Sequence, residues 1–406
     1  MRHHDTIRPV SSFSRNVCVI GGGGHVGLPL ALTLANAGYR TVVYDTNRAV
    51  LDRIGSGAMP FMETGGEALL RSVLASGRLE LESKPDPIAD CEFLVIIIGT
   101  PVDEHLNPNL TTIRRVLDEC RQWLRDGQVL ILRSTVVPGM TEHIQRYLAS
   151  HGLRISVGFC PERVAQGKSL EEFTTLPQII SAFDEETMRR IRALFAPFTS
   201  ELIELEPREA EMAKLMTNAW RYIQFATVNQ FYTLATAEGL DFARILHACR
   251  HNYPRMSGMP SPGLTAGPCL MKDTMQLAAF SRDGFVLGHA AMMVNEGLPA
   301  HLVTLAKRRI DLGAASAGIL GMAFKAGSDD PRDSLSYKLR KLLLLEARSV
   351  LCTDPYVRDG SLAPLDRVVA ESDVLFVATP HPEYRGLQIP KEKVVVDVWN
   401  IVEGGR

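Results

Sequence analysis

The chain has 406 residues, of which 46% are hydrophobic and 22% charged, so it is long enough for two or three globular domains with sizeable cores. Its formal net charge of −2 offers no general attraction to nucleic acid or to an anionic membrane surface. The apolar runs are too short to span a bilayer, and residues 1–16 lack the apolar core of a signal peptide. We therefore expect neither nucleic acid nor a membrane as a partner.

Seven cysteines are scattered along the chain without a C-x-x-C pair. An odd, dispersed set is typical of a reducing compartment, which predicts a cytoplasmic protein, and most single cysteines of this kind serve only as small core residues. Nothing in their spacing predicts a metal site.

The first half of the chain alternates short apolar strands with helices. Strands are predicted at 17–20, 41–44, 93–98 and 129–132, and helices at 26–37 and 113–124. Short apolar strands separated by helices indicate a parallel sheet covered on both faces.

The second half begins with a long helix and ends with a return of the alternating pattern. Residues 209–238 contain neither proline nor glycine and carry apolar side chains at helical spacing. A loop rich in proline and glycine follows at 254–268, and strands are predicted at 318–321, 349–353, 374–379 and 394–398. We expect an α/β protein with two Rossmann-like, doubly wound parallel-sheet domains joined by a long central helix and a helical linker. The predicted domains are a first Rossmann-like domain (1–205), a helical linker (206–305) and a second Rossmann-like domain (306–406).

A glycine-rich turn follows the first strand and opens the first helix. Gly22, Gly24 and Gly27 satisfy the G-x-G-x-x-G pattern, in which the glycines allow a tight turn, close approach of backbone to pyrophosphate, and close helix packing. The helix N-terminus would face the phosphates. Asp45, at the end of the second strand, could accept from both ribose hydroxyls and would repel a 2′-phosphate, so NAD is favoured over NADP.

Cys269 follows Pro268, and proline is typical of the first turn of a helix, so the cysteine is expected at a helix N-terminus. There the helix dipole, with Lys272, would lower the pKa of the thiol and favour thiolate. Asp273 lies one helical turn further along the same face. From these residues alone, a structural cysteine in a turn is favoured over a nucleophile.

Lys214 and Asn218 lie four residues apart on the predicted long helix, with Arg221 almost one turn further. A cation and an amide on one stripe could hold an oxyanion, although a solvated polar face is the commoner explanation.

Taken together, these segments resemble the UDP-glucose/GDP-mannose dehydrogenase family over nearly the full length of the chain. The matching motifs follow one another in the family's order: Gly24 to Pro29, Gly99-Thr100-Pro101, Arg133 to Gly139, Pro161-Glu162-Arg163, Lys214 to Asn218, Cys269 to Asp273, Gly321 to Lys325, Asp330 to Ser334, and Asp354-Pro355-Tyr356.

The resemblance implies catalytic roles at these positions. Cys269 would be the nucleophile, and Lys214, Asn218 and Asp273 would surround its thiohemiacetal and the hydrolytic water. Thr135 would help to hold that water, and Glu162 would be the base in thioester hydrolysis.

The resemblance also implies binding residues and a homodimer. Residues implied at the NAD site are Gly22, Gly24, His25, Val26, Gly27, Asp45, Thr100, Pro101, Thr135 and Lys272. Residues implied at the nucleotide-sugar site are Glu162, Lys214, Asn218, Arg255, Gly267, Lys325 and Arg332, with Arg255 reaching the neighbouring subunit's site.

The activity implied is an NAD-dependent, four-electron oxidation of the C6 primary alcohol of a nucleotide sugar to a uronic acid through a cysteine thiohemiacetal and thioester. The substrate implied is either UDP-glucose or a UDP-N-acetylhexosamine, because the Cys-Leu-x-Lys-Asp segment resembles the UDP-glucose branch and Pro161–Gly167 and Asn252–Arg255 resemble the N-acetyl-sugar branch. The chain departs from the family at Ala266, where a glycine is usual, and lacks an arginine near Asp397–Asn400.

Two other functions fit part of the pattern. A two-electron dehydrogenase of the β-hydroxyacid type shares the first domain and the long helix, but needs neither Cys269 nor a second Rossmann-like domain. A catalytically silent protein that binds NAD or a nucleotide sugar would not need the set that surrounds the cysteine. The number of NADH molecules made per sugar, two, one or none, separates the three.

Overall fold

The structure is a computed structural model that describes residues 13–103, 111–199, 201–265, 267–282 and 284–402. The chain forms two compact units, residues 1–215 and 216–406. The expected division into three domains, at 205/206 and 305/306, stays a prediction.

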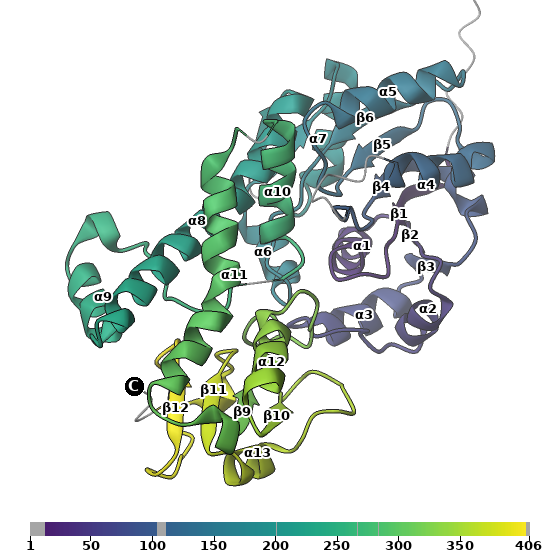
Figure 1. The fold of residues 1–406 in the computed structure, drawn as a ribbon. Helices are drawn as coiled ribbons and strands as arrows, with labels where there is room; N and C mark the ends of the chain where they lie inside the picture. The colour runs from purple at the N-terminus through teal and green to yellow at the C-terminus, as the bar shows by residue number, and fades with distance from the viewer. Residues whose placement is uncertain (1–12, 104–110, 200, 266, 283, 403–406) are drawn as a thin grey trace, which may run out of the picture. The chain divides into compact units, whose positions relative to one another are not determined.

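A parallel sheet forms the centre of the first unit, with its six strands in the order β3-β2-β1-β4-β5-β6 (Figure 1). This is the order of a doubly wound dinucleotide-binding sheet, whose ligand crevice lies at the carboxyl ends of the strands where the order reverses, between β1 and β4. The strands are β1 (Arg15–Ile20), β2 (Thr41–Tyr44), β3 (Leu79–Glu82), β4 (Cys91–Ile96), β5 (Val129–Leu132) and β6 (Ser156–Phe159).

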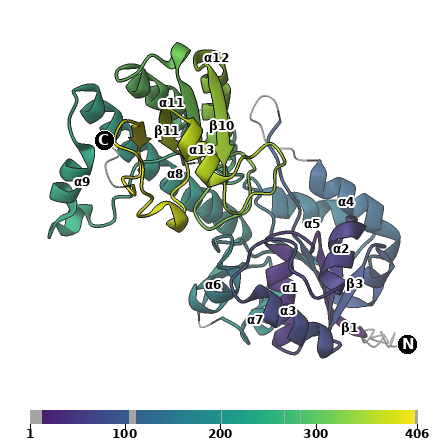
Figure 2. The same cartoon turned by 90° about the horizontal axis from the view of Figure 1, so that it is seen from below.

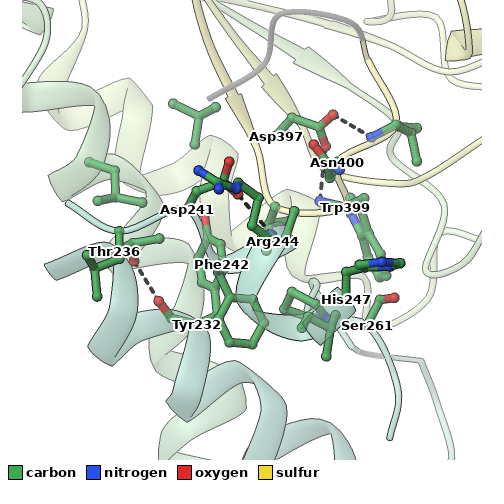
Figure 3. Close-up of a pocket in the computed structure, with 18 of the residues that line it drawn as sticks. Tyr232, Thr236, Asp241, Phe242, Arg244, His247, Ser261, Asp397, Trp399 and Asn400 are labelled. Carbon is green, nitrogen blue, oxygen red and sulfur yellow. Dashed lines mark hydrogen bonds between the residues drawn. The ribbon is translucent and has the colours of Figure 1, made fainter. Parts of the chain in front are cut away.

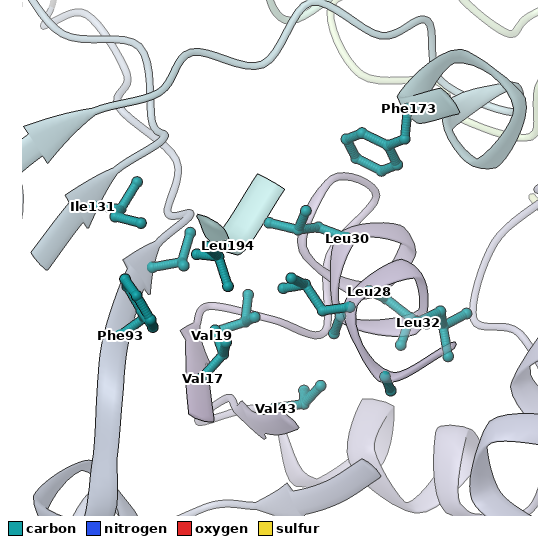
Figure 4. Close-up of a cluster of buried hydrophobic side chains, with 14 of the residues drawn as sticks. Val17, Val19, Leu28, Leu30, Leu32, Val43, Phe93, Ile131, Phe173 and Leu194 are labelled. Atoms are coloured by element: carbon teal, nitrogen blue, oxygen red, sulfur yellow. The ribbon is translucent and has the colours of Figure 1, made fainter. Parts of the chain in front are cut away.

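Alternate residues of β1 enter two separate cores, one on each face of this sheet. Val17 and Val19 belong to the core shown in Figure 4, where they lie near Leu28 and other side chains of α1, whereas Cys18 belongs to the other core. A strand buried on both faces reads as a continuous apolar run, which is why the sequence predicted it. The helices of this unit are α1 (Gly27–Asn36), α2 (Arg48–Gly55), α3 (Gly66–Ala75), α4 (Thr112–Cys120), α5 (Met140–Ser150), α6 (Ser169–Thr175) and α7 (Glu185–Phe195).

Two further strands of the first unit, β7 (Gln178–Ser181) and β8 (Leu202–Leu205), pair with each other in parallel. The long helix α8 (Pro207–Ala237) follows, as predicted. It begins two residues earlier than expected because proline is tolerated in the first helical turn.

The second unit carries a smaller parallel sheet, with its four strands in the order β10-β9-β11-β12 (Figure 2). Its strands are β9 (Ser316–Leu320), β10 (Ser349–Thr353), β11 (Val374–Val377) and β12 (Val394–Asp397). Its helices after α8 are α9 (Phe242–Arg250), α10 (Leu270–Phe280), α11 (Val286–Lys307), α12 (Leu335–Glu346) and α13 (Leu365–Glu371). The prediction of two Rossmann-like sheets with a long central helix is confirmed. Within the described residues, no helix combines the length and the apolar character needed to cross a membrane.

Candidate active site

The turn between β1 and α1 can be built only with glycine at two of the three motif positions. A Cβ added at Gly22 would lie 2.8 Å from the carbonyl oxygen of Val19, and one added at Gly27 would lie 2.7 Å from the Cα of Gly22. Gly21, just before, has a φ of +78°. The turn is therefore as tight as the motif predicted, and α1 begins directly against the end of β1.

Gly24 is different, because a Cβ there would meet only the carbonyl oxygen of Gly21, at 3.9 Å. The residue is exposed, so the chain is bare of side chains just ahead of the α1 N-terminus. A bare backbone in front of free helical N–H groups suits a pyrophosphate group, so these residues fit NAD.

Asp45 lies beside this turn, at the end of β2. Its carboxylate accepts hydrogen bonds from the backbone N–H groups of Gly23 and Asn47, each at 2.9 Å. A carboxylate can accept about four hydrogen bonds, so Asp45 keeps capacity for the hydroxyls of a ribose.

Lys272, also predicted at the NAD site, lies on α10 of the second unit, whereas the remaining predicted NAD residues lie on loops at the carboxyl ends of β1, β4 and β5. His25 stacks on Phe61 with ring centroids 4.2 Å apart, and Val26 is the N-cap residue of α1. The hydroxyl of Thr100 donates to the carbonyl of Thr135 at 2.8 Å, so the loops after β4 and β5 are joined. Pro101 directly follows Thr100.

Glu162 lies in a closed ion pair with Arg133. One carboxylate oxygen accepts from Nε and Nη2 of Arg133, and the other accepts from the backbone N–H groups of Arg163 (2.7 Å) and Val164 (2.8 Å). These four bonds fill the acceptor capacity of the carboxylate. Glu162 therefore holds the 161–164 segment here, and the predicted role of base requires one bond to Arg133 to open. Arg133, which is 2% exposed, stands in one of the matching motifs, but sequence reasoning gave it no role.

Lys214 and Asn218 lie one turn apart on α8, and both are buried, whereas Arg221 is exposed. The polar stripe is thus not a solvated face, and the commoner explanation given above is wrong for these two residues. The amide nitrogen of Asn218 donates to Oδ2 of Asp273 at 2.5 Å. A buried amide and a buried carboxylate one turn beyond Cys269 give the cysteine a polar neighbourhood.

Cys269 is the N-cap residue of α10 and is exposed, as predicted for a helix N-terminus. Its carbonyl accepts from the N–H of Asp273 at 2.8 Å. The Lys272 ammonium lies 2.7 Å from Oδ1 of Asp273, so it pairs with this buried carboxylate. The described cysteines other than Cys269 are buried or half-buried, which makes Cys269 the most accessible thiol of the described chain.

The segment before Cys269 packs against the loop that follows β9. The N–H of Gly267 donates to the carbonyl of Asp333 at 3.3 Å, and a Cβ at Gly267 would lie 2.5 Å from the ring of Phe324. Gly267 also has a φ of +104°, so this position requires glycine. Ala266, the departure noted above, lies outside the described residues.

Lys325 and Arg332 both lie on this loop. Nζ of Lys325 is 5.8 Å from the centre of the Phe324 ring, and Arg332 forms hydrogen bonds with both oxygens of Asp330. The hydrogen bond to Asp330 is the main cause of the raised pKa of Arg332, and negative charge on Cys269 contributes to it. A guanidinium on this loop is therefore close enough to Cys269 for their charges to interact.

Arg255 lies apart from these groups, on a 3-10 turn (Pro254–Met256). It is exposed and packs over the ring of Tyr253, 5.5 Å from its centre.

The segment after Arg255 is held by Asn229, a fully buried residue of α8. The side chain of Asn229 donates to the carbonyl of Gly263 and accepts from the N–H of Gly263. Asn229 lies eleven residues after Asn218, which is three helical turns, and this spacing could have predicted a place on the same face.

A cavity of about 1560 Å³ in the second unit contains none of the predicted site residues (Figure 3). It is lined by the end of α8, by α9 and by the end of β12, with Tyr232, Arg244, His247 and Trp399 on its walls. Among the described residues, no group of three or more histidine, cysteine, aspartate or glutamate side chains could hold a metal ion.

Three family models match consecutive parts of the chain. They describe the NAD-binding domain (residues 15–199), the central domain (208–296) and the UDP-binding domain (318–404) of the UDP-glucose/GDP-mannose dehydrogenase family.

Curated relatives and solved structures cover nearly the whole chain. A UDP-N-acetyl-D-mannosamine dehydrogenase of Pyrococcus horikoshii is 30% identical over 94% of this chain and 95% of its own. The structure of a UDP-D-ManNAc dehydrogenase from Pyrococcus horikoshii, 29% identical, superposes with a TM-score of 0.88 over 96% of each chain. A UDP-glucose dehydrogenase from Pyrobaculum islandicum, 28% identical, superposes with a TM-score of 0.89 over 97% of this chain and 96% of its own. The chain therefore belongs to the UDP-glucose/GDP-mannose dehydrogenase family and is an NAD-dependent nucleotide-sugar dehydrogenase.

Proposed function

We propose that this enzyme oxidises the C6 primary alcohol of a UDP-N-acetylhexosamine to a carboxylate through a thioester on Cys269. The observation that carries the proposal is an exposed thiol at the start of α10 with the buried Asn218–Asp273 pair one turn away. An alcohol-to-acid oxidation that releases no aldehyde needs such a nucleophile.

The chemistry on Cys269 follows from its surroundings. Bound NAD+ supplies the hydride acceptor for both oxidations. The Cys269 thiolate adds to the aldehyde carbon and forms a thiohemiacetal, and loss of a hydride from that carbon leaves the thioester. Water then adds to the thioester, the C–S bond breaks, and the acid gains its second oxygen from that water. The helix N-terminus and Arg332 favour the thiolate that begins and ends the sequence.

The neighbouring side chains have distinct proposed roles. Lys214 and Asn218 stabilise the oxyanion of the thiohemiacetal, and Asp273 fixes the amide of Asn218. Thr135 holds the hydrolytic water, and Glu162 takes its proton after one bond to Arg133 opens. In Glu162→Gln, hydrolysis of the thioester should therefore slow more than either oxidation step.

The N-acetylated sugar is supported by the names of relatives. Curated relatives include several UDP-N-acetyl-D-mannosamine dehydrogenases and an NDP-N-acetyl-D-galactosaminuronic acid dehydrogenase of Ralstonia solanacearum, 26% identical over 94% of this chain. The PER-V-x-x-G stretch at 161–167 supports the same branch. Turnover against UDP-, GDP- and TDP-sugars, with and without N-acetyl groups, tests this choice, and preference for UDP-glucose would overturn it.

A homodimer is supported by an apolar stripe along α8. Met216, Trp220, Phe231 and Leu234 are each at least 45% exposed on this one helix. Contiguous exposed apolar side chains mark an interface, and a second copy of α8 offers a matching surface. Arg255 would complete the partner's site. Light scattering should give the mass of a dimer, and Trp220→Glu should yield a monomer of low activity. A fully active wild-type monomer contradicts the proposal.

The three-domain division and a cytoplasmic location belong to the same proposal. The spans of the three matched domains support boundaries near 205 and 305. The seven free cysteines support a reducing compartment.

The decisive experiment replaces Cys269 with alanine and follows product by mass spectrometry and NADH by absorbance. Acid formation should fall by several orders of magnitude, while NAD+ and UDP-sugar still bind with near-normal affinity in a calorimeter. Cys249→Ala, on α9, is the matched control and should keep two NADH per sugar. Uronic acid formed by Cys269→Ala at a near-wild-type rate, or one NADH per sugar in the wild type, would favour two-electron chemistry instead.

A further inference from the structure

The loop between β9 and α12, residues 321–334, connects the proposed nucleotide residues to the nucleophile. It carries Lys325 and Arg332, and through Phe324 and Asp333 it packs on Gly267, two residues before Cys269. The position of this loop therefore decides both where the nucleotide is held and how the segment before Cys269 lies.

Asp354, directly after β10, holds the start of this loop. Its side chain is fully buried. Oδ2 accepts from the N–H groups of Met322 (2.6 Å) and Ala323 (2.9 Å), and Oδ1 accepts from those of Tyr356 and Val357. Four backbone donors on one buried carboxylate mean that Asp354 is ionised and has a fixed orientation.

His381, also fully buried, extends this contact to the middle of the loop. One ring nitrogen, Nε2, lies 3.1 Å from Oδ2 of Asp354, and the other, Nδ1, accepts from the N–H of Gly327 at 3.2 Å. A backbone N–H can only donate, so Nδ1 must carry a lone pair. The proton of a neutral ring then sits on Nε2 and is donated to Asp354. A second proton on Nδ1 would face the Gly327 N–H, and this hydrogen bond would be lost.

We infer that His381 is a positioning residue, which holds the 321–334 loop in place for the nucleotide sugar through its bonds to Gly327 and Asp354. The inference rests on the proposed role of Lys325 and Arg332. Besides Asp354, the titratable groups that face the ring are Tyr356 (ring centroids 5.2 Å apart) and Tyr384 (5.7 Å), with Glu383 bonded to the Tyr356 hydroxyl. Burial is the main cause that raises the pKa of Tyr384, and the bond to Glu383 raises that of Tyr356 to about 12. Both phenols therefore stay neutral near neutral pH and place no charge beside the ring.

Two substitutions separate the two bonds of His381. In His381→Asn, Oδ1 takes the place of Nδ1 and can accept from Gly327, whereas the donor to Asp354 is lost. In His381→Gln, Nε2 takes the place of the ring Nε2 and can donate to Asp354, whereas the acceptor for Gly327 is lost. Neither side chain titrates.

Amide hydrogen exchange tests the loop without any ligand. The Gly327 amide should lose protection in His381→Gln and keep most of it in His381→Asn. The N–H of Gly21, which donates to the carbonyl of Tyr44 at 2.8 Å, is the control because neither substitution changes its acceptor. Since the two variants have opposite expected effects on the Gly327 amide, either one tests the inference if the other fails to fold. Protection of Gly327 in His381→Gln equal to that of the wild type, or its loss in a folded His381→Asn, would overturn the inference.

Kinetics with UDP-N-acetyl-D-mannosamine tests the consequence for the nucleotide sugar. The KM for the sugar should rise about tenfold in His381→Gln and much less in His381→Asn, as expected for one unmade hydrogen bond. The KM for NAD+ should not change. A KM for the sugar equal to that of the wild type in both variants would overturn the positioning role, whereas loss of the acid product in every variant and in the wild type would instead contradict the proposed function.

Discussion

The two parallel sheets carry an aspartate at the same topological place, and the two aspartates have different functions. Asp45 ends β2, the neighbour of β1, and Asp354 ends β10, the neighbour of β9. Each accepts from the backbone of the turn that follows the central strand. Asp45 accepts two backbone hydrogen bonds and is half-buried, whereas Asp354 is fully buried and accepts from four backbone groups and His381.

The turns themselves differ in the same sense. Gly21 and Gly321, each the first residue after the central strand, are both enclosed, but the first turn continues to Gly24, which leaves bare backbone at the surface. A fold can thus be repeated within one chain while only one of the two sheets keeps the exposed backbone and the unused hydrogen-bond acceptors that a dinucleotide needs. In the second sheet, the corresponding aspartate, Asp354, instead holds the loop that carries Lys325 and Arg332.

Gly321→Ala should have the largest effect on stability. Gly321 has a φ of +97°, and a Cβ there would lie 2.4 Å from the Cβ of Thr379 and 2.8 Å from its backbone nitrogen. Left-handed backbone and overlap together should lower the free energy of unfolding of the second unit by about 2–5 kcal/mol, measured in urea. Gly360→Ala is the control, since a Cβ there would meet nothing within 4 Å. A loss below about 1 kcal/mol would mean that the second turn is not closed at Gly321.

Asp354→Asn should lower the free energy of unfolding by less than Gly321→Ala does, and this loss should depend on pH in a defined way. Burial alone would raise the pKa of Asp354, but hydrogen bonds from His381 and backbone N–H groups lower it to about 2. A lowered pKa contributes stability that is present above the unfolded-state value, near 3.9, and is lost as the pH falls toward 2.

The variant should therefore be less stable than wild type by about 2 kcal/mol at pH 5–8, and the difference should shrink below about pH 4. Urea unfolding across this range measures it. Affinity for NAD+ should stay unchanged, because Asp354 has no part in the NAD site. A difference that grows toward acid pH would contradict the assigned ionisation of Asp354.

Much of this contrast could be predicted from the sequence, because the relevant signals are local. The buried strands read as apolar runs, and the turn glycines and Asp45 follow from one motif. The long helix was predictable because residues 209–238 lack helix breakers. The strands β3, β6, β7 and β8 escaped prediction, because polar residues or glycine interrupt each short apolar run, and β3 alternates leucine with glutamate.

The pairings of side chains could not be predicted, because they join residues far apart in the chain. Arg133 and Glu162 are 29 residues apart, and Asp354 and His381 are 27. Only the fold brings them together, and only the fold shows that all acceptor positions of Glu162 are filled. Sequence similarity implied that Glu162 acts as a base, but it could not show that the carboxylate is closed by an ion pair.

Asp45→Ala should affect NAD+ more than stability. Removal of the carboxylate leaves the N–H groups of Gly23 and Asn47 to water, at a cost of about 1 kcal/mol or less in the free energy of unfolding. Loss of charged hydrogen bonds to a ribose should weaken NAD+ binding by about 1–3 kcal/mol, measured by calorimetry. Asp52→Ala on α2, where the carboxylate is 72% exposed, is the control. Unchanged affinity would refute the assignment of Asp45 to the ribose.

Gly24→Ala should have the smallest effect on stability and provides the sharpest test of the first turn. The φ of Gly24 is not in the left-handed region, and the nearest atom to an added Cβ is 3.9 Å away, so the free energy of unfolding should change by no more than about 0.5 kcal/mol. The new methyl group would nevertheless occupy the surface that the pyrophosphate must approach, and NAD+ affinity should fall by about tenfold or more. Gly22→Ala provides the contrast, because its Cβ would lie 2.8 Å from a carbonyl oxygen and should destabilise the unit itself. Thermal unfolding and NAD+ calorimetry on both variants separate the two roles of glycine. If Gly24→Ala bound NAD+ as tightly as wild type, the open surface of the first turn would not be the cofactor site, and the distinction drawn between the two turns would fail.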